Sequence, residues 1–297
     1  MKFKRRAFSK MTAGALLAGS ASAIHRISLA QEDTLLATAI EIEKRLGARL
    51  GLAVIDEETG KRWNYQADQR FPMCSTFKAI AVGAVLAQVD KGEDSLNRVV
   101  NIAEGDLVSY SPVTENRLGG TGMTLAEICE AALTMSDNTA GNKLLESIGG
   151  PDGLTAFARL IDDNVSRLDR WETGLNEAAI GDVRDTTSPE AMSQTLRSLL
   201  LGDVLSSNSR EQFKEWMVNN KTGDAKLRAG VPSSWQVGDK TGGGNNGTMA
   251  DIAIIWPPNR KPLSIAVYMT ETDASFDDRN LGISEIAAAL QVAIQSS

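Results

Sequence analysis

The segments of this chain that have strand character lie near its two ends, and a long helical middle separates them. They cover residues 50–55, 62–65, 235–237, 252–256 and 263–269. The turn-forming run Glu57-Glu58-Thr59-Gly60 joins the first two segments into a hairpin. The simplest assembly brings the early hairpin and the late strands together in one antiparallel sheet.

The middle of the chain has apolar residues at helical spacing, in segments bounded by Gly, Pro, Asn or Asp. The helical segments cover residues 79–89, 125–135, 153–160 and 189–201, with two more, 35–46 and 284–294, near the ends. The fold class is thus α+β/α. We expect an α/β lobe of residues 31–71 and 226–297, in which the terminal helices flank the sheet, and a helical lobe of residues 72–225. An active site is expected between the lobes, where clefts commonly lie.

The first 30 residues have the layout of an export signal. Positive side chains stand at positions 2, 4, 5, 6 and 10, and the apolar run Met11–Ala18 that follows is too short to span a bilayer. Small residues then offer cleavage sites after Ala23 and after Ala30. The pair Arg5-Arg6 favours a twin-arginine signal, and an ordinary Sec signal is the alternative. Either route predicts an exported, periplasmic protein without a membrane span.

The only histidine of the chain, His25, lies inside the segment that export would remove. The mature protein then has no histidine, which excludes a Ser-His-Asp triad, a Cys-His pair and a histidine-ligated zinc site. Residues 1–30 carry six positive and no acidic side chains, so cleavage changes the net charge from −7 to −13. Such an acidic surface argues against nucleic acid and anionic membranes as partners.

Two cysteines, Cys74 and Cys129, are available for redox or metal chemistry. Export permits a disulfide, but the two cysteines lie in different helical patterns that the sequence does not place side by side. Two thiolates alone do not make a structural zinc site either. We therefore predict two free, buried thiols. No metal ion and no cofactor is expected.

The run Ser75-Thr76-Phe77-Lys78 places a hydroxyl and an amine on one face of a helix, because residues at i and i+3 are neighbours there. Pro72, just before this run, favours the first turn of a helix. The partial positive charge at that end of the helix stabilises an oxyanion near Ser75. A lysine of lowered pKa can activate such a serine. Alone the pattern is weak, since Ser-x-x-Lys is expected about once by chance in a chain of this length.

Three further short patterns carry polar groups. Ser136-Asp137-Asn138 follows a helical segment, and helix capping is an alternative explanation for it. Lys240-Thr241-Gly242 follows a strand-like segment and runs into Gly243, so a ligand can approach the backbone closely. A second copy of this tripeptide, at 221–223, ends a helical run and is interpreted as a helix stop. Glu172 and Asn176 stand in an aperiodic loop, where a glutamate can hold and deprotonate a water, although most loop glutamates are simply exposed.

Ser-x-x-Lys, Ser-Asp-Asn, Glu172 with Asn176 and Lys-Thr-Gly follow one another along the chain in this order. The mature part is expected to be exported and to have no histidine, and with these patterns it resembles the class A serine β-lactamases. The resemblance covers essentially the whole mature chain. It implies a β-lactamase/transpeptidase-like fold with a five-stranded antiparallel sheet. The implied catalytic residues are Ser75 as the acylated nucleophile, Lys78 in its activation, Ser136 as proton donor to the departing nitrogen, Glu172 with Asn176 on the hydrolytic water, and Lys240 facing the substrate carboxylate.

The resemblance also implies binding and structural residues. The substrate-binding residues are Asn138, Thr241, Gly242, Gly243, Tyr110 and Lys226. Arg170 and Asp185 match an ion pair that closes the loop around Glu172. Met249 stands where many relatives have an arginine for the substrate carboxylate, so we expect Lys226, Arg228 or Arg279 to replace it, with Lys226 the first choice. Which base drives acylation, Lys78 or Glu172 through water, stays open.

The predicted function is hydrolysis of penicillins and cephalosporins through an acyl-enzyme, with antibiotic resistance as the consequence. The predicted partner is a small-molecule β-lactam, bound by a monomer. A penicillin-binding transpeptidase or carboxypeptidase is one alternative, and a penicillin-sensing module that stays acylated is another. Glu172 and Asn176 favour the hydrolase, because rapid deacylation needs a held water.

Overall fold

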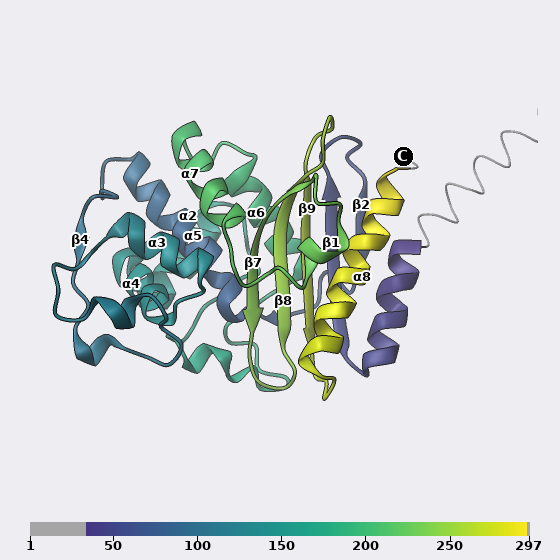
Figure 1. Cartoon of the computed structure of the whole chain (residues 1–297), viewed down its shortest axis with the longest axis horizontal. Helices are drawn as coiled ribbons and strands as arrows, with labels where there is room; N and C mark the ends of the chain where they lie inside the picture. The colour runs from purple at the N-terminus through teal and green to yellow at the C-terminus, as the bar shows by residue number, and fades with distance from the viewer. Residues whose placement is uncertain (1–33, 296–297) are drawn as a thin grey trace, which may run out of the picture.

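The computed structural model describes residues 34–295, and an antiparallel sheet of five strands lies at its centre (Figure 1). The strands are β1 (Arg49–Asp56), β2 (Arg62–Tyr65), β7 (Gln236–Gly243), β8 (Met249–Trp256) and β9 (Leu263–Thr270). Their order is β2-β1-β9-β8-β7, so β1 of the first hairpin pairs with the last strand, with Ala53 opposite Ala266. The predicted meeting of the two chain ends in one sheet is confirmed. The predicted export signal at residues 1–30 lies outside the described residues.

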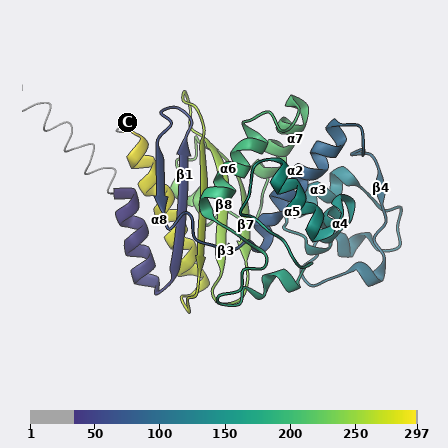
Figure 2. The same cartoon turned by 180° about the vertical axis from the view of Figure 1, so that it is seen from behind.

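Strand β8 is covered on both faces, and its alternate residues enter two different cores. Ile252 and Ile254 pack in the core that the middle helices share, whereas Ala253 and Ile255 pack under the terminal helices. This alternation is the side-chain period of two of a strand. The helix of residues 34–46 and α8 (Phe276–Ile294) lie side by side and close the second core (Figure 1 and Figure 2).

Helices build the part of the molecule on the other face of the sheet. They are α2 (Phe77–Asp90), α3 (Leu125–Thr134), α4 (Asn138–Ile148), α5 (Gly150–Leu160), α6 (Pro189–Leu200) and α7 (Ser207–Val218). Eleven residues of α2 are buried, on all sides of the helix, as is typical of a helix that runs through a core. Helix α6 packs on β1, β8 and β9 and so joins the helices to the sheet. Two short antiparallel pairs, β3 (Phe71–Pro72) with β6 (Thr186–Thr187) and β4 (Val99–Val100) with β5 (Met123–Thr124), tie the connecting loops together.

Two helices differ from the sequence prediction. Helix α8 begins at Phe276, eight residues before the predicted start, because the Ser275 side chain caps it by accepting the N–H of Asp278 at 3.1 Å. Helix α4 was not predicted as an element, and Asp137 caps it by accepting the N–H of Ala140 at 2.8 Å. No helix among residues 34–295 combines the length and the apolar character that a membrane crossing requires.

Candidate active site

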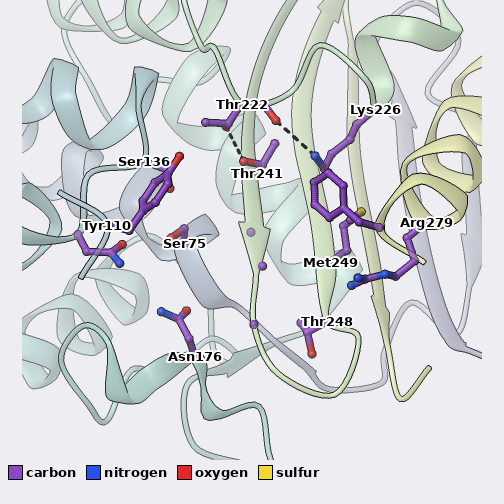
Figure 3. Close-up of a pocket in the computed structure, with 15 residues that line it drawn as sticks. Ser75, Tyr110, Ser136, Asn176, Thr222, Lys226, Thr241, Thr248, Met249 and Arg279 are labelled. Carbon is purple, nitrogen blue, oxygen red and sulfur yellow. Dashed lines mark hydrogen bonds between the residues drawn. The ribbon is translucent and has the colours of Figure 1, made fainter. Parts of the chain in front are cut away.

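A cleft of about 530 Å³ lies where strand β7 meets the helical part of the molecule (Figure 3). Nine of the predicted catalytic and substrate-binding residues line it: Ser75, Tyr110, Ser136, Asn138, Asn176, Lys226, Thr241, Gly242 and Gly243. Three more, Lys78, Glu172 and Lys240, are buried nearby and contact the lining residues. The remaining lining residues are Thr222, Gly244, Thr248, Met249, Phe276 and Arg279.

Ser75 lies in a 3-10 turn, η1 (Cys74–Thr76), that leads directly into α2. The Nζ atom of Lys78 is 3.0 Å from its Oγ. The same Nζ atom lies 2.9 Å from the carbonyl oxygen of Ser136, 2.7 Å from Oδ1 of Asn138 and 3.0 Å from Oε1 of Glu172. Four oxygens thus surround a group that has at most three protons to donate. Only Ser75 among the four has a proton of its own, so its hydroxyl is the group that can donate within this cluster.

Burial lowers the pKa of the Lys78 amine, and the neighbouring charge of Glu172 opposes this effect. Burial also holds the pKa of Lys240 well below its ordinary value, and the repulsion of Lys78 lowers it further. A lowered pKa increases the fraction of neutral amine at a given pH, and a neutral amine is what a proton acceptor must be. The electrostatics of the cleft therefore favour proton transfer to a lysine.

Ser136 reaches the cleft from the turn between α3 and α4. Lys240 donates to its Oγ at 2.9 Å and to the carbonyl oxygen of Thr241 at 2.7 Å. The intervening Asp137 caps α4 and accepts the N–H groups of Val113 and Thr114, each at 2.9 Å. Capping and cleft lining are therefore both present in Ser136-Asp137-Asn138: the middle residue fixes the turn, and the outer two face the cleft.

Glu172 lies close to Ser75, with Oε1 3.4 Å from the serine Oγ. The Nδ2 group of Asn176 donates to its other oxygen at 2.6 Å. Sequence reasoning missed Asn142, whose side chain accepts the N–H of Glu172 at 2.9 Å and donates to its carbonyl oxygen at 3.1 Å. The signal was its position four residues after Asn138, which puts both amides on neighbouring turns of one face of α4.

The loop from Arg170 to Asp185 carries Glu172 and is anchored at its base by the buried carboxylate of Asp185. That carboxylate accepts three hydrogen bonds, from the N–H of Asp169 at 2.7 Å, the N–H of Arg170 at 2.9 Å and Nε of Arg170 at 2.5 Å. The backbone of Asp185 also accepts the N–H of Met73 at 2.9 Å. The loop base is thus tied to the chain two residues before Ser75.

Thr222 of the second Lys-Thr-Gly tripeptide lines the cleft, so the interpretation of this tripeptide as only a helix stop is wrong. Helix α7 has already ended at Val218. The hydroxyl of Thr222 is 2.6 Å from that of Thr241, which belongs to the strand copy. A side chain at Gly223 would put its Cβ 1.9 Å from Oδ2 of Asp239, so a glycine is needed for this close approach to β7.

Lys226 is a buried cation on the wall beyond Thr241, and its Nζ donates to the carbonyl oxygen of Thr222 at 3.3 Å. Two buried carboxylates, Asp239 and Asp251, lie near it. Burial raises the pKa of both, and the charge of Asp239 raises that of Asp251 further. Oδ1 of Asp251 has no hydrogen-bond partner among the described residues, and the raised pKa favours the neutral form of this carboxyl.

The other basic residues near Met249 have different positions. Arg228 donates to Oδ1 of Asp239 at 2.5 Å and to carbonyl oxygens at the end of α7, and it does not line the cleft. Arg279 does line the cleft, together with Lys226. Met249 itself is buried, so the wall is apolar at the position where many relatives have an arginine.

Both cysteines are free and buried, as predicted. Burial raises the pKa of each thiol above its ordinary value. The Sγ atom of Cys74 packs against Gly244, where an added Cβ would approach it to 2.7 Å. Residues 34–295 contain no group of three or more His, Cys, Asp or Glu side chains that could hold a metal ion.

Known proteins resemble this chain over most of its length. A family model described as the β-lactamase enzyme family matches residues 35–294. The chain is 48% identical over 254 residues to β-lactamase FAR-1 of Nocardia farcinica, covering 86% of this chain and 81% of that protein. It is 51% identical over 238 residues to β-lactamase CTX-M-8 of Citrobacter amalonaticus, covering 80% and 81%.

Solved structures resemble it equally well. An ancestral class A β-lactamase superposes with a TM-score of 0.86 at 57% identity, covering 87% of this chain and 99% of that one. A putative class A β-lactamase, PenP from Rhodopseudomonas palustris, superposes with a TM-score of 0.86 at 53% identity, covering 88% and 100%.

Proposed function

The chain belongs to the class A β-lactamases, and we propose that its cleft opens the β-lactam ring with Ser75 and clears the acyl-enzyme with a water held by Glu172. Its activity is the hydrolysis of β-lactam antibiotics, with resistance as the consequence. One observation carries the proposed route: the carboxylate of Glu172 reaches Ser75 with one oxygen and is held by Asn176 at the other.

Acylation begins with the loss of the Ser75 proton. Lys78 at 3.0 Å can accept it directly, and Glu172 can accept it directly or through a water. Both routes end with the serine oxygen bonded to the lactam carbonyl carbon. The backbone N–H groups of Ser75 and Gly243 form the oxyanion hole of this step, and the N-terminal end of α2 adds favourable partial charge.

Opening of the ring requires a proton on the departing nitrogen. Because Lys240 donates to Oγ of Ser136, the proton of the Ser136 hydroxyl remains available for donation into the cleft. After the hydroxyl proton has passed to the nitrogen, the Oγ atom of Ser136 can take a proton from Lys240, which donates to it. Ser136 is therefore the proton donor, and Lys240 orients it.

The substrate carboxylate lies between Ser136, Thr241 and Lys226, where hydroxyl and ammonium donors line the cleft. Asn138 binds the side-chain amide of the substrate, and the exposed ring of Tyr110 covers the entrance. Gly242 permits the close approach of β7 to the serine turn, since a Cβ there would lie 2.9 Å from the carbonyl oxygen of Met73.

Deacylation needs a water between Glu172 and the ester carbon. The Oδ1 atom of Asn176 is buried and has no hydrogen-bond partner among the described residues, so it is an acceptor that a water can satisfy. Glu172 then removes a proton from this water as it attacks. This arrangement argues against a transpeptidase and against a sensor that stays acylated, because neither needs such a site.

We further propose that the protein is exported to the periplasm and acts as a monomer. The composition of residues 1–30 supports export, and every side chain of the proposed route comes from one chain. We also propose that the lobes meet at residues 71/72 and 225/226, with the cleft between them.

The test is turnover of a chromogenic cephalosporin by purified protein, with a Ser75→Ala variant as control. We expect many turnovers per molecule, and no hydrolysis above background by the variant. A single stoichiometric burst without turnover would identify a penicillin-binding or penicillin-sensing protein instead.

A further inference from the structure

The far end of the cleft has two cations close to one exposed aromatic ring. The Nζ atom of Lys226 lies 5.3 Å from the centre of the Phe276 ring, and the guanidinium carbon of Arg279 lies 6.0 Å from it. Phe276 is 60% exposed although it lines the cleft. Figure 3 shows Lys226, Met249 and Arg279 together, across strand β7 from Ser75, with the Arg279 side chain directed toward the cleft.

Neither cation is neutralised by a direct ion pair. Within the described part of the chain, no carboxylate oxygen lies within 4.0 Å of Lys226 or of Arg279 in a salt bridge, although many arginines elsewhere are paired. The hydrogen bonds of the two side chains go to backbone oxygens, that of Thr222 at 3.3 Å and that of Ser275 at 3.3 Å. Asp251, which attracts Lys226, lies behind the wall and not in the cleft.

The two charges also act on each other. Burial lowers the pKa of Lys226, and the positive charge of Arg279 lowers it as well. Burial also lowers the pKa of Arg279. Two partly desolvated cations that repel each other are stabilised by an anion between or beside them. The single carboxylate on the ring of a bound substrate would lie near Thr241 and Lys226, and Arg279 would then still lack an anionic partner.

We propose that Phe276 and Arg279 form a second anion subsite, which takes a flat, negatively charged substituent placed next to the ring carboxylate of the substrate. This inference rests on the proposed function. In a cephalosporin the C3 substituent is attached beside the carbon that carries the carboxylate, so it extends along the wall beyond Lys226. A heteroaromatic ring stacks on Phe276, and its acidic group pairs with the planar guanidinium of Arg279.

The subsite predicts a preference between two cephalosporins that share the same C7 side chain. One carries a C3 heteroaromatic ring with an acidic group, and the other carries the same ring without it. We expect the kcat/KM ratio of acidic to neutral substrate to fall about fivefold in Arg279→Gln, mainly through KM, because one partly exposed ion pair is lost. Arg279→Lys keeps the charge and is expected to retain more than half of the preference.

Lys44→Gln is the matched control, since it removes one positive charge from an exposed site on the helix of residues 34–46. It is expected to leave the ratio unchanged, which separates a local contact from a change in overall charge. An equal change for both substrates in Arg279→Gln, or an unchanged ratio, overturns the subsite. Turnover of the neutral cephalosporin by the unaltered enzyme tests the proposed function separately, because that substrate does not use Arg279.

Discussion

The amine of Lys78 is surrounded by more acceptor oxygens than it has protons to donate. Its four oxygen neighbours exceed the three protons of an ammonium, and burial lowers its pKa. Both facts favour a cluster in which the Ser75 proton moves easily between the hydroxyl, the amine and Glu172. The neighbours themselves come from three separate parts of the chain, the α2 start, the α3–α4 turn and the Glu172 loop.

Asn142 gives the first prediction at this scale. It holds both backbone groups of Glu172, so Asn142→Ala removes two hydrogen bonds worth about 1 kcal/mol each. We expect deacylation to slow roughly 10- to 30-fold while acylation changes less, as measured by burst amplitude and steady-state rate. Asn116→Ala, at an exposed asparagine, serves as control and is expected to behave as the unaltered enzyme. Equal slowing of both steps would show that Asn142 supports the fold rather than Glu172.

Residue-level prediction from sequence succeeded where spacing along one helix decided the geometry. Ser75 and Lys78 are three residues apart, and helix geometry alone predicts their contact. Asn142 and Thr222 were missed because their roles depend on partners 30 and 19 residues away along the chain. The spacing of Asn142 from Asn138 puts the two amides on one helix face, but it does not reveal that Glu172 is the partner.

Among the elements, the loop from Arg170 to Asp185 depends most on a single side chain. Asp185→Asn replaces an acceptor of three hydrogen bonds by a group that can accept at only one atom. We expect a loss of about 2 kcal/mol in the free energy of unfolding and a larger fall in kcat than in the acylation rate, because Glu172 is displaced. Urea denaturation and pre-steady-state kinetics measure the two effects. If the variant is destabilised but deacylates at the normal rate, Asp185 does not position Glu172 for the hydrolytic water, and the prediction is wrong.

Strand β8 carries a pH-dependent contribution through Asp251. Because the pKa of this buried carboxyl is raised in the folded state, its contribution to stability is present below the ordinary pKa of 3.8 and is lost as the pH rises through the folded value. Asp251→Asn has nearly the same shape and does not titrate. The variant is therefore expected to gain in melting temperature relative to the unaltered protein as the pH rises above about 4. A difference that is constant over pH 4–9 would contradict a raised pKa of Asp251 in the folded state.

The elements themselves followed largely from sequence periodicity. Four middle helices and the first hairpin were predicted within a few residues, because their apolar spacing and bounding residues agree. The start of α8 was placed too late, since the cap at Ser275 precedes residues with little apolar periodicity. Helix α4 was not predicted, because the run at its start, Ser136-Asp137-Asn138, was interpreted as a cleft pattern or a helix cap and not as the beginning of a new helix.

The whole molecule joins its two cores through one sheet. Residues on one face of β8 and β9 belong to the helical core, and residues on the other face belong to the core of the terminal helices. Breaking either core exposes the sheet to water, so we expect urea unfolding to be one cooperative transition. Far-UV circular dichroism and tryptophan fluorescence, with Trp63 in one core and Trp216 in the other, are expected to give the same midpoint. Separate midpoints would show that the lobes unfold independently.

The central claim is that Ser75 carries the acyl group and that Glu172 enables water to remove it. Intact-protein mass spectrometry of Glu172→Gln mixed with a penicillin tests both halves at once. We predict that the variant gains the mass of one penicillin within the mixing time and keeps it long after the unaltered enzyme has returned to its free mass, with the added mass on the peptide that contains Ser75. Release by the variant at the unaltered rate, or the added mass on another peptide, would contradict the account.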